Sequence, residues 1–319
     1  MKTKIYLTRK IPQAGIDILK KQGYRLVINQ LDNPASRQTL LREIKDAQAI
    51  LCMLSDRIDA ELIESGKRLK VISAYAVGID NIDVGYATKK GIIVTNTPGV
   101  LTEATAEVTW ALLFACARRV TEADRYVRAG RFKVWGPTLL LGRQISGKTL
   151  GIIGAGRIGQ SVGRKARAFG MKVLYFNRSK EPLFEKDTQA RRVSLQKLLK
   201  ESDFITLHLP LTKDTRYFIK LKELRVMKPT AYFINVARGP IVREADLAYA
   251  LKHNFIAGAG MDVYENEPKV HPGLLKLNNV TLLPHLGSGT VEARTRMAEI
   301  AAENIVAVLQ NKRPEFRVS

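Results

Sequence analysis

Short apolar runs alternate with amphipathic stretches from one end of this chain of 319 residues to the other. The apolar runs have the length of buried strands, and the amphipathic stretches have the spacing of helices that cover a sheet. This alternation is typical of parallel α/β architecture, and a chain of this length rarely folds around a single core. We therefore expect two α/β domains.

The first third of the chain predicts one series of strands and helices, and a second series begins near residue 148. The expected early strands are Ile5–Thr8, Arg25–Ile28, Ala49–Met53, Val71–Ala74 and Ile92–Thr95, with helices near Ile11–Gln22, Ser36–Ile44, Asp59–Glu64 and Val84–Lys90. The later strands are Leu150–Ile153, Val173–Phe176, Phe204–Leu207, Tyr232–Asn235, Ile256–Met261 and Val280–Leu283, and a helix over Val291–Leu309 ends the chain. One long helix, from Glu103 to about Arg128, is expected between the two series. It packs either within the subunit or against a second subunit.

A glycine-rich turn is the strongest local signal. It reads Gly154-Ala-Gly156-Arg-Ile-Gly159, directly after an expected strand and before a helical pattern over Gln160–Phe169. In this context Gly154 permits a tight turn, Gly156 lets the backbone approach a pyrophosphate, and Gly159 lets the helix pack on the strand. The N-terminus of that helix would face the phosphates. The turn predicts a dinucleotide site, and a glycine turn without a ligand is the alternative.

The next strand ends in Asn177-Arg178-Ser179-Lys180. An NAD-binding protein carries Asp or Glu about 20 residues past the glycines, where it accepts a hydrogen bond from the ribose 2′-hydroxyl. Here Asn177 takes that place, and a guanidinium, a hydroxyl and an ammonium follow, which suit a 2′-phosphate. The segment predicts a preference for NADPH (NADP when oxidised), with NADH still possible. The alternative is that Arg178 and Lys180 are ordinary solvated charges.

The composition has a large basic excess. Lys and Arg number 52 against 30 Asp and Glu, which gives a formal net charge of +22. The excess is spread along the chain, without a basic tail and without aromatic residues among the basic runs, so a nucleic-acid arm is not indicated. We interpret it as a solvated basic surface. A field that attracts anionic ligands is the second interpretation, and nucleic-acid binding is the third.

Cysteine content and hydropathy limit the cellular compartments in which the protein is expected. Cys52 and Cys116 fit no metal-ligand spacing and are expected to be buried thiols in a reducing compartment. The first ten residues lack the apolar stretch of a signal peptide, and no apolar segment approaches the roughly 20 residues of a membrane span. We expect a soluble cytoplasmic protein that binds neither metal nor membrane.

Reduction of a carbonyl by a nicotinamide cofactor needs a proton donor beside the oxygen and an anchor for the substrate. Of the four histidines, His208 fits a packed strand end, His253 a solvated helix end and His271 a loop. His285 follows an apolar strand and precedes Leu286-Gly-Ser-Gly289, and open α/β sheets bind their ligands at such a strand end. His285 is therefore the candidate acid/base.

Two charged residues also follow expected strands. Arg238, in Asn235-Val-Ala-Arg-Gly239, has the planar fork that binds a carboxylate in bidentate fashion. Glu267 could pair with a histidine, which favours the charged form of the ring and fixes its orientation. Taken separately, each of these two residues is better explained by a surface ion pair than by a catalytic role.

Several segments, taken in order, resemble the D-isomer-specific 2-hydroxyacid dehydrogenase family, and within it the glyoxylate/hydroxypyruvate reductases. The resemblance covers nearly the whole chain. Its segments are Tyr75-Ala-Val-Gly78-Ile-Asp-Asn-Ile-Asp83, Asn96-Thr-Pro98, Gly147-Lys-Thr-Leu-Gly-Ile-Ile-Gly-Ala-Gly-Arg-Ile-Gly159, Asn235-Val-Ala-Arg-Gly239, Gly258-Ala-Gly-Met-Asp-Val263, Glu267-Pro268 and Pro284-His285.

The resemblance implies roles for the candidate residues. His285 would protonate the carbonyl oxygen as hydride arrives, Arg238 would hold the substrate's carboxylate and reacting oxygen, and Glu267 would keep His285 protonated. Asp262 would meet the nicotinamide carboxamide. The cofactor-binding residues would be Gly154, Gly156, Arg157, Ile158, Gly159, Asn177, Arg178, Ser179, Val236, Ala237, Arg238, Asp262, His285 and Gly287, and the substrate-binding residues Leu54, Ser55, Val77, Gly78, Arg238 and His285.

The resemblance also implies an architecture. A flavodoxin-like substrate-binding domain would comprise residues 1–98 and 285–319, and a Rossmann cofactor domain would be inserted over residues 99–284, with hinges near Pro98-Gly99 and Pro284. Closure of the two domains would exclude water from the substrate. Members are usually dimers, so a homodimer is expected in which the long helix after Gly99 forms much of the interface and Trp135 lines the neighbouring subunit's pocket.

Three alternatives are weighed against this interpretation. Phosphite dehydrogenases share the framework but carry a lysine where this chain has Val77, which argues against that substrate. A short-form D-3-phosphoglycerate dehydrogenase remains open, although Asn177-Arg-Ser argues against its usual NAD. A dinucleotide-sensing corepressor of the same fold also remains open, since such proteins can keep the catalytic residues. A gel shift with unrelated DNA would test direct nucleic-acid binding. We expect an enzyme that acts on a small 2-oxoacid.

Overall fold

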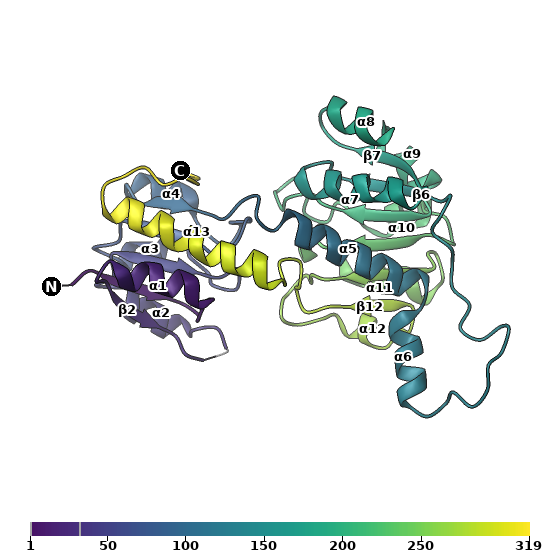
Figure 1. Ribbon diagram of the computed structural model, residues 1–319, viewed down its shortest axis with the longest axis horizontal. Helices are drawn as coiled ribbons and strands as arrows, with labels where there is room; N and C mark the ends of the chain where they lie inside the picture. The colour runs from purple at the N-terminus through teal and green to yellow at the C-terminus, as the bar shows by residue number, and fades with distance from the viewer. Residues whose placement is uncertain (1, 32) are drawn as a thin grey trace. The chain divides into compact units, whose positions relative to one another are not determined.

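The computed structural model describes residues 2–31 and 33–319. The chain divides into two compact units, the first formed by Met1–Leu101 with Thr290–Ser319 and the second by Thr102–Gly289 (Figure 1). Each unit is built on a sheet in which all strand pairs are parallel. The expectation of two parallel α/β folds is therefore confirmed.

The first unit has a five-stranded sheet in the order β2-β1-β3-β4-β5. This order is the flavodoxin-like one, as expected. The strands are β1 (Lys4–Leu7), β2 (Arg25–Ile28), β3 (Ala49–Cys52), β4 (Val71–Ala74) and β5 (Ile93–Thr95). The helices are α1 (Gln13–Lys21), α2 (Arg37–Ile44), α3 (Ala60–Ser65), α4 (Val84–Lys89) and α13 (Val291–Leu309).

The C-terminal helix α13 belongs to the first unit because it packs on α1 and β4. Gly15 of α1 lies so close to Ala298 that an added Cβ would stand 2.5 Å from its carbonyl oxygen. Ser73 in β4 donates a hydrogen bond of 3.0 Å to the carbonyl of Ala301. Thr290 caps the helix by accepting from the Ala293 N–H, which fixes where it begins.

The second unit has a seven-stranded sheet in the order β12-β11-β10-β9-β6-β7-β8. The first strand of the unit, β6, lies inside the sheet, and later strands are added on both sides of it. This is the doubly wound Rossmann pattern. The strands are β6 (Thr149–Ile153), β7 (Lys172–Phe176), β8 (Arg191–Arg192), β9 (Phe204–Leu207), β10 (Tyr232–Asn235), β11 (Gly258–Met261) and β12 (Val280–Leu282). The helices are α5 (Thr102–Ala117), α6 (Val120–Arg128), α7 (Arg157–Ala168), α8 (Pro182–Thr188), α9 (Leu195–Glu201), α10 (Leu221–Val226), α11 (Glu244–Lys252) and α12 (Pro272–Leu275), with a 3₁₀ turn η1 over Gly239–Ile241.

The single long helix expected from Glu103 to about Arg128 is wrong, because the segment forms two helices, α5 and α6. Arg119 between them adopts a left-handed conformation with φ of 54°. The carbonyl of Ala117, which a continuing helix would offer to residue 121, instead accepts from the N–H of Arg143 at 2.7 Å. A distant part of the chain therefore ends α5, and no local breaker residue marks the position.

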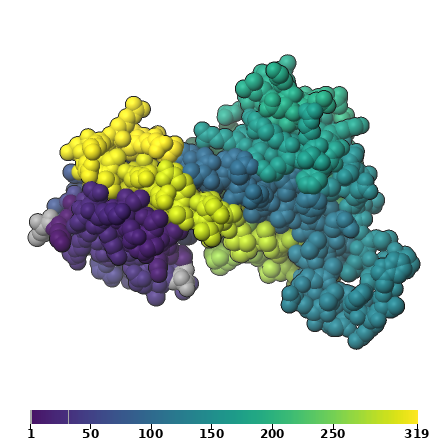
Figure 2. Space-filling view, viewed as in Figure 1, coloured from purple at the N-terminus to yellow at the C-terminus, as the bar shows by residue number. Residues whose placement is uncertain are grey.

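Helix α6 and the segment after it project from the body of the second unit, and we call residues 120–145 the arm. Figure 2 shows the arm standing clear of the surface that α7 and α8 form. α6 buries none of its residues. Five large apolar residues along the arm expose between 53% and 78% of their surface, namely Val127, Phe132, Val134, Trp135 and Leu141.

Both cysteines are free and buried, as expected. Burial raises the pKa of the Cys116 thiol to about 11, so it remains protonated at neutral pH. Cys52 in β3 is raised further for the same reason, with the nearby Asp56 carboxylate adding to the effect.

Candidate active site

The glycine-rich turn has the geometry that the sequence predicts for it. Gly154 adopts φ of +97° at the end of β6, where a residue with a side chain would be strained and would press on the His208 backbone. At Gly159 an added Cβ would lie 2.2 Å from the carbonyl oxygen of Gly154. These two glycines therefore allow α7 to begin directly on the end of β6.

The start of α7 can receive a phosphate group. An added Cβ at Gly156 would meet no atom within 4 Å, so the turn opens on free space at this point. Gly156 is the N-cap and supplies no capping side chain, and in the described chain no side chain bonds to the cap position. The N–H groups of the first turn, around the exposed Arg157 and the half-buried Ile158, therefore remain available to an anion. The turn fits the pyrophosphate of a dinucleotide.

The segment after β7 brings Asn177 and Ser179 together around a carboxylate. The Asn177 Nδ2 donates to Glu181 Oε1 at 2.9 Å, and the Ser179 Oγ donates to the same oxygen at 3.1 Å. The guanidinium of Arg192 holds the backbone of this segment by donating to the carbonyls of Asn177 and Arg178 at 3.0 and 2.6 Å. The side chain of Arg178 is exposed.

The pair of His285 and Glu267 lies past the carboxyl ends of β11 and β12. His285 Nδ1 stands 2.8 Å from Glu267 Oε2. Burial acts to raise the pKa of Glu267, but the hydrogen bond and charge of His285, the N–H of Tyr264 and the charge of Arg238 outweigh it, so the pKa lies below its ordinary value. Glu267 is therefore an anion at neutral pH, and it fixes the ring of His285 with Nε2 as the nitrogen left for a substrate.

Asp262 holds the backbone that carries His285. Its buried carboxylate accepts from the N–H groups of Leu286 and Gly287 at 2.6 and 2.8 Å, while its carbonyl accepts from the His285 N–H at 2.8 Å. His285 itself is left-handed, with φ of 57°. A residue other than glycine rarely adopts this conformation, and strain of this kind is concentrated at functional sites. Burial raises the pKa of Asp262 above its ordinary value.

Arg238 follows β10 and lies close enough for its charge to act on Glu267. Its backbone is fixed by Asn235, whose Nδ2 donates to the Arg238 carbonyl at 3.2 Å and whose Oδ1 accepts from Ala237 at 3.0 Å. Val236 is buried between them. The structure thus brings together the three residues for which the sequence predicts catalytic roles.

A second carboxylate, Glu244, pins the loop in which Glu267 lies. Glu244 begins α11 and is 3% exposed. Its Oε1 accepts from the Glu265 N–H and its Oε2 from the His271 N–H, the latter at 3.1 Å. One buried side chain therefore holds both sides of the loop 265–271. Burial raises the pKa of Glu244, although these backbone donors oppose the shift.

The other histidines have no place in this cluster. Both ring nitrogens of His208 are buried and bond to no described group, and burial lowers the His208 pKa to about 3. His253 lies at the end of α11, with Nδ1 2.8 Å from the Tyr249 carbonyl. His271 caps α12 by accepting from Gly273 at 3.1 Å. His208 is therefore neutral at physiological pH, whereas the proposed acid role needs a charged ring.

In the first unit, the expected substrate residues occupy the turns after β3 and β4. Leu54 is half-buried and Ser55 is exposed, while Val77 is 37% exposed. Asn81 ties the first turn by donating from Nδ2 to the carbonyls of Met53 and Asp56 at 3.0 and 2.8 Å. Gly78 follows Val77, whose carbonyl accepts from Asn96 Nδ2 at 2.9 Å. Both turns are thus held by side-chain amides.

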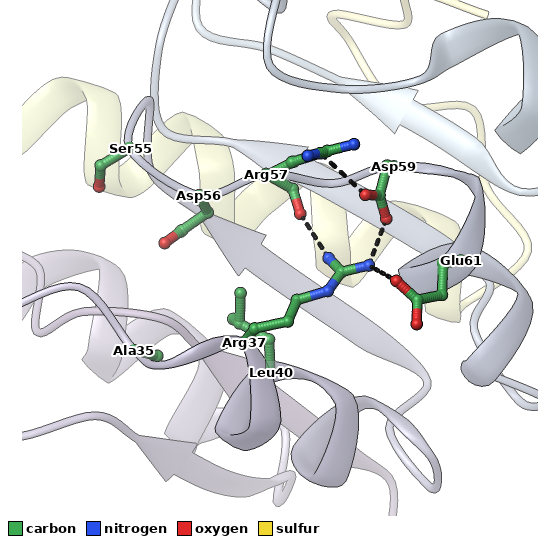
Figure 3. Close-up of a pocket in the computed structure, with 8 residues that line it drawn as sticks. All are labelled: Ala35, Arg37, Leu40, Ser55, Asp56, Arg57, Asp59 and Glu61. Carbon is green, nitrogen blue, oxygen red and sulfur yellow. Dashed lines mark hydrogen bonds and ion pairs between the residues drawn. The ribbon is translucent and has the colours of Figure 1, made fainter. Parts of the chain in front are cut away.

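A hollow of about 380 Å³ lies beside Ser55 in the first unit (Figure 3). Its most prominent cation, Arg37, is turned toward acidic groups, bonding to Asp59 at 2.5 Å and to Glu61 at 2.6 Å. The hollow therefore presents a neutralised guanidinium, which gives an anionic substrate little to bind. Its lining residues are Ala35, Arg37, Leu40, Ser55, Asp56, Arg57, Asp59 and Glu61.

Within residues 2–31 and 33–319, no group of three or more His, Cys, Asp or Glu side chains is arranged to hold a metal ion. In the same ranges no helix has both the length and the apolarity to cross a bilayer.

Comparison with known proteins decides the family. Residues 110–287 match the profile described as D-isomer specific 2-hydroxyacid dehydrogenase, NAD binding domain. The chain belongs to this family of D-isomer specific 2-hydroxyacid dehydrogenases. It is 48% identical to a glyoxylate reductase of Thermococcus litoralis over 318 residues, which cover 98% of this chain and 96% of that protein. The matched region contains the glycine turn and the Arg238, Glu267 and His285 cluster.

Solved structures of two reductases have the same fold over nearly the full chain. A glyoxylate reductase from Paecilomyes thermophila is 34% identical with a TM-score of 0.87, over 99% of this chain and 98% of that one. An NADPH-dependent glyoxylate/hydroxypyruvate reductase from Sinorhizobium meliloti, solved with NADP and malonate, is 30% identical with a TM-score of 0.87, over 100% and 97% of the two chains. This dehydrogenase is therefore an NAD(P)-dependent oxidoreductase, and its resemblance to the glyoxylate reductases is confirmed.

Sequence reasoning missed two carboxylates near the expected sites of this dehydrogenase. Glu181 lies four residues past Asn177, and Glu244 lies six residues past Arg238. For Glu181 the available signal was an acidic residue just after the basic segment Arg178–Lys180. Nothing in the sequence near Glu244 shows that its carboxylate folds back onto the loop 265–271.

Proposed function

We propose that this dehydrogenase reduces small 2-oxoacids, glyoxylate and hydroxypyruvate, to the corresponding 2-hydroxyacids, with NADPH as the preferred cofactor. The observation that carries the proposal is the pair of His285 and Glu267 at 2.8 Å, beside Arg238 and at the end of a Rossmann sheet. The names of the relatives from Thermococcus litoralis and Sinorhizobium meliloti support the two substrates.

Each residue of the cluster would have a separate role in the reduction. The nicotinamide, when bound, supplies the hydride. Arg238 would bind the carboxylate of the oxoacid and polarise its carbonyl, and the protonated His285 would give its proton from Nε2 to the carbonyl oxygen. Glu267, which is ionised well below neutral pH, would stabilise the charged ring before that transfer.

Other residues keep the roles that the family implies, as proposals. Gly154, Gly156 and Gly159 would admit the pyrophosphate, with Arg157 and Ile158 at the helix start. Val236, Ala237, Asp262 and Gly287 would lie along the nicotinamide, where Asp262 also holds the backbone of residues 286 and 287. Leu54, Ser55, Val77 and Gly78 would contact the oxoacid. In this proposal residues 1–98 and 285–319 bind substrate and residues 99–284 bind cofactor.

The proposed preference for NADPH depends on the segment after β7. Asn177 and Ser179 present an amide and a hydroxyl, and the exposed Arg178 adds a cation. These groups suit a 2′-phosphate better than they suit a bare hydroxyl, because charge-assisted hydrogen bonds to phosphate are stronger than neutral ones.

We also propose a cytoplasmic homodimer in which the arm meets a second copy of the chain. The arm exposes Val134 to 78% and Trp135 to 74%, and α6 with α5 borders a hollow of about 660 Å³ lined by Phe114, Arg118, Val120, Ala123, Asp124 and Val127. Exposed apolar area of this extent is typical of an interface. Trp135 would reach the neighbouring subunit's pocket.

The proposed function is tested by the loss of nicotinamide absorbance in the purified protein. Glyoxylate and hydroxypyruvate are offered with NADPH and then with NADH, and 3-phosphoglycerate is offered with NAD for the reverse reaction. We expect rapid oxidation of NADPH by one or both oxoacids. Turnover of 3-phosphoglycerate alone would make the protein a short-form phosphoglycerate dehydrogenase, and cofactor binding without any turnover would favour a sensing role.

A further inference from the structure

Glu181 occupies the site where the ribose 2′-group of the cofactor is expected. Its Oε1 accepts from both Asn177 and Ser179, and its Oε2 accepts from Gln160 Nε2 at 3.3 Å. Gln160 lies in the first turns of α7, so the carboxylate bridges the segment after β7 and the helix that begins at the glycine turn. The side chains of Asn177 and Ser179 were expected to donate to a 2′-phosphate. In this structure both donate to Glu181 instead.

A carboxylate at this place has opposite effects on the two cofactors. It can accept a hydrogen bond from the 2′-hydroxyl of NADH, which is the part that Asp or Glu plays in NAD-binding Rossmann proteins. Toward the 2′-phosphate of NADPH it presents a like charge and competes for the same two donors. NADPH can therefore bind fully only when Glu181 releases Asn177 and Ser179.

The release is local because the backbone on both sides is fixed. The N–H of Glu181 donates to the Tyr175 hydroxyl at 2.9 Å, and Arg192 holds the carbonyls of Asn177 and Arg178. Gln160 has a second acceptor, the Ala155 carbonyl at 3.0 Å, and keeps it if Glu181 leaves. A rotation of the half-buried Glu181 side chain toward solvent would thus free the two donors without moving the chain.

We propose that Glu181 sets the ratio of NADPH to NADH use by this protein, as an acceptor for the 2′-hydroxyl of NADH and a competitor of the 2′-phosphate of NADPH. This inference rests on the proposed function, since it concerns the same cofactor site. Asn177, Arg178 and Ser179 favour NADPH, while Glu181 reduces that preference and maintains the binding of NADH.

The test is calorimetric binding of NADP and NAD to the wild type, to Glu181→Gln and to Asp187→Asn. Glutamine keeps the shape of the side chain and removes its charge. Asp187 is the matched control, because it lies in α8, the helix that follows Glu181 directly, is half exposed and pairs with Arg164 at 3.5 Å rather than with Asn177 or Ser179. The NADPH-to-NADH ratio of kcat/KM is measured beside the dissociation constants.

In Glu181→Gln we expect NADP to bind roughly tenfold more tightly and NAD to bind severalfold more weakly, the size of one charge-assisted hydrogen bond. In Asp187→Asn both constants should stay within about twofold of the wild type. An unchanged ratio in Glu181→Gln, or an equal change in Asp187→Asn, would overturn the inference. If the wild type binds neither dinucleotide, the proposed function itself fails, which is a separate outcome.

Discussion

At the scale of single residues, the site depends on side chains whose partners are held in place. Arg238 follows β10 with its backbone fixed by Asn235, and its charge helps to keep Glu267 ionised. A guanidinium offers two parallel donors to a carboxylate, whereas an ammonium offers a point charge. The shape of the Arg238 side chain is therefore expected to matter as much as its charge.

Replacing Arg238 with lysine tests this expectation. Arg238→Lys should lower kcat/KM for glyoxylate by roughly 10- to 100-fold, because the bidentate contact is lost while the charge is kept. NADP affinity should fall far less than kcat/KM, because the glycine turn that would bind the pyrophosphate is unchanged. Steady-state kinetics with Arg243→Lys as the control measures this, since Arg243 is exposed and stands 3.9 Å from Asp246. Equal activity of wild type and Arg238→Lys would remove Arg238 from substrate binding.

Residue identity predicts chemistry better than it predicts conformation. The sequence was sufficient to predict catalytic roles for His285, Arg238 and Glu267, because each follows an apolar strand in a recognisable segment. The sequence could not predict the left-handed backbone of His285 or the hydrogen bonds from the N–H groups of residues 286 and 287 to Asp262. Both depend on how loops from separate strands meet. For the same reason the contact of Glu181 with Asn177 and Ser179 could be seen only in the fold.

At the scale of elements, the loop between β11 and α12 determines where Glu267 stands. Glu244 at the start of α11 holds this loop at Glu265 and His271. The Tyr264 N–H donates to Glu267 Oε1 at 3.0 Å, which leaves Oε2 for His285. Glu244 is therefore a positioning residue, and it acts on His285 through Glu267.

Changing Glu244 should alter the pH profile. In Glu244→Gln one backbone donor faces an amide N–H, so the loop loosens and Glu267 stabilises the charged ring of His285 less. A looser loop also weakens the His285 contact that lowers the pKa of Glu267, so that pKa rises and the acid limb of glyoxylate reduction should move to higher pH, with kcat/KM down about tenfold at neutral pH. pH-rate profiles measure both effects, and Asp246→Asn, whose carboxylate accepts from Leu221 at 3.0 Å, is the control.

A double-mutant cycle separates this positioning role from general stability. If Glu244 acts through Glu267, then Glu244→Gln should cost little further activity in a Glu267→Gln background. Additive losses in the two backgrounds would mean that Glu244 only stabilises the fold.

The break between α5 and α6 shows where element prediction from sequence ends. Apolar spacing favours one helix from residue 103 to 128, and it cannot include the hydrogen bond from Arg143 to the Ala117 carbonyl. By contrast, the bounds of α13 agree with the expectation, because Thr290 and the apolar pattern define that helix locally. Elements whose ends are set by their own caps are predictable, and elements ended by remote segments are not.

At the scale of the whole molecule, the strand orders follow from the alternation of strands and helices and from the recognised family. The arm does not, because several of its apolar side chains, Val134 and Trp135 among them, lie exposed in the described part of the chain. We expect the protein to sediment at about twice its 35.6 kDa. Val134→Asp with Trp135→Ala should shift it toward the monomer, since a buried charge opposes association. A wild type that sediments as a monomer would contradict the proposed interface.

The central claim is that His285, oriented by Glu267, protonates the substrate of a dehydrogenase. The most direct measurement compares wild type and His285→Ala in two assays, NADPH oxidation by glyoxylate and calorimetric binding of NADP. We predict that His285→Ala loses about 10²- to 10⁴-fold in kcat, because the proton donor is gone, while NADP binds within about threefold of the wild type. Turnover retained in His285→Ala would contradict the claim.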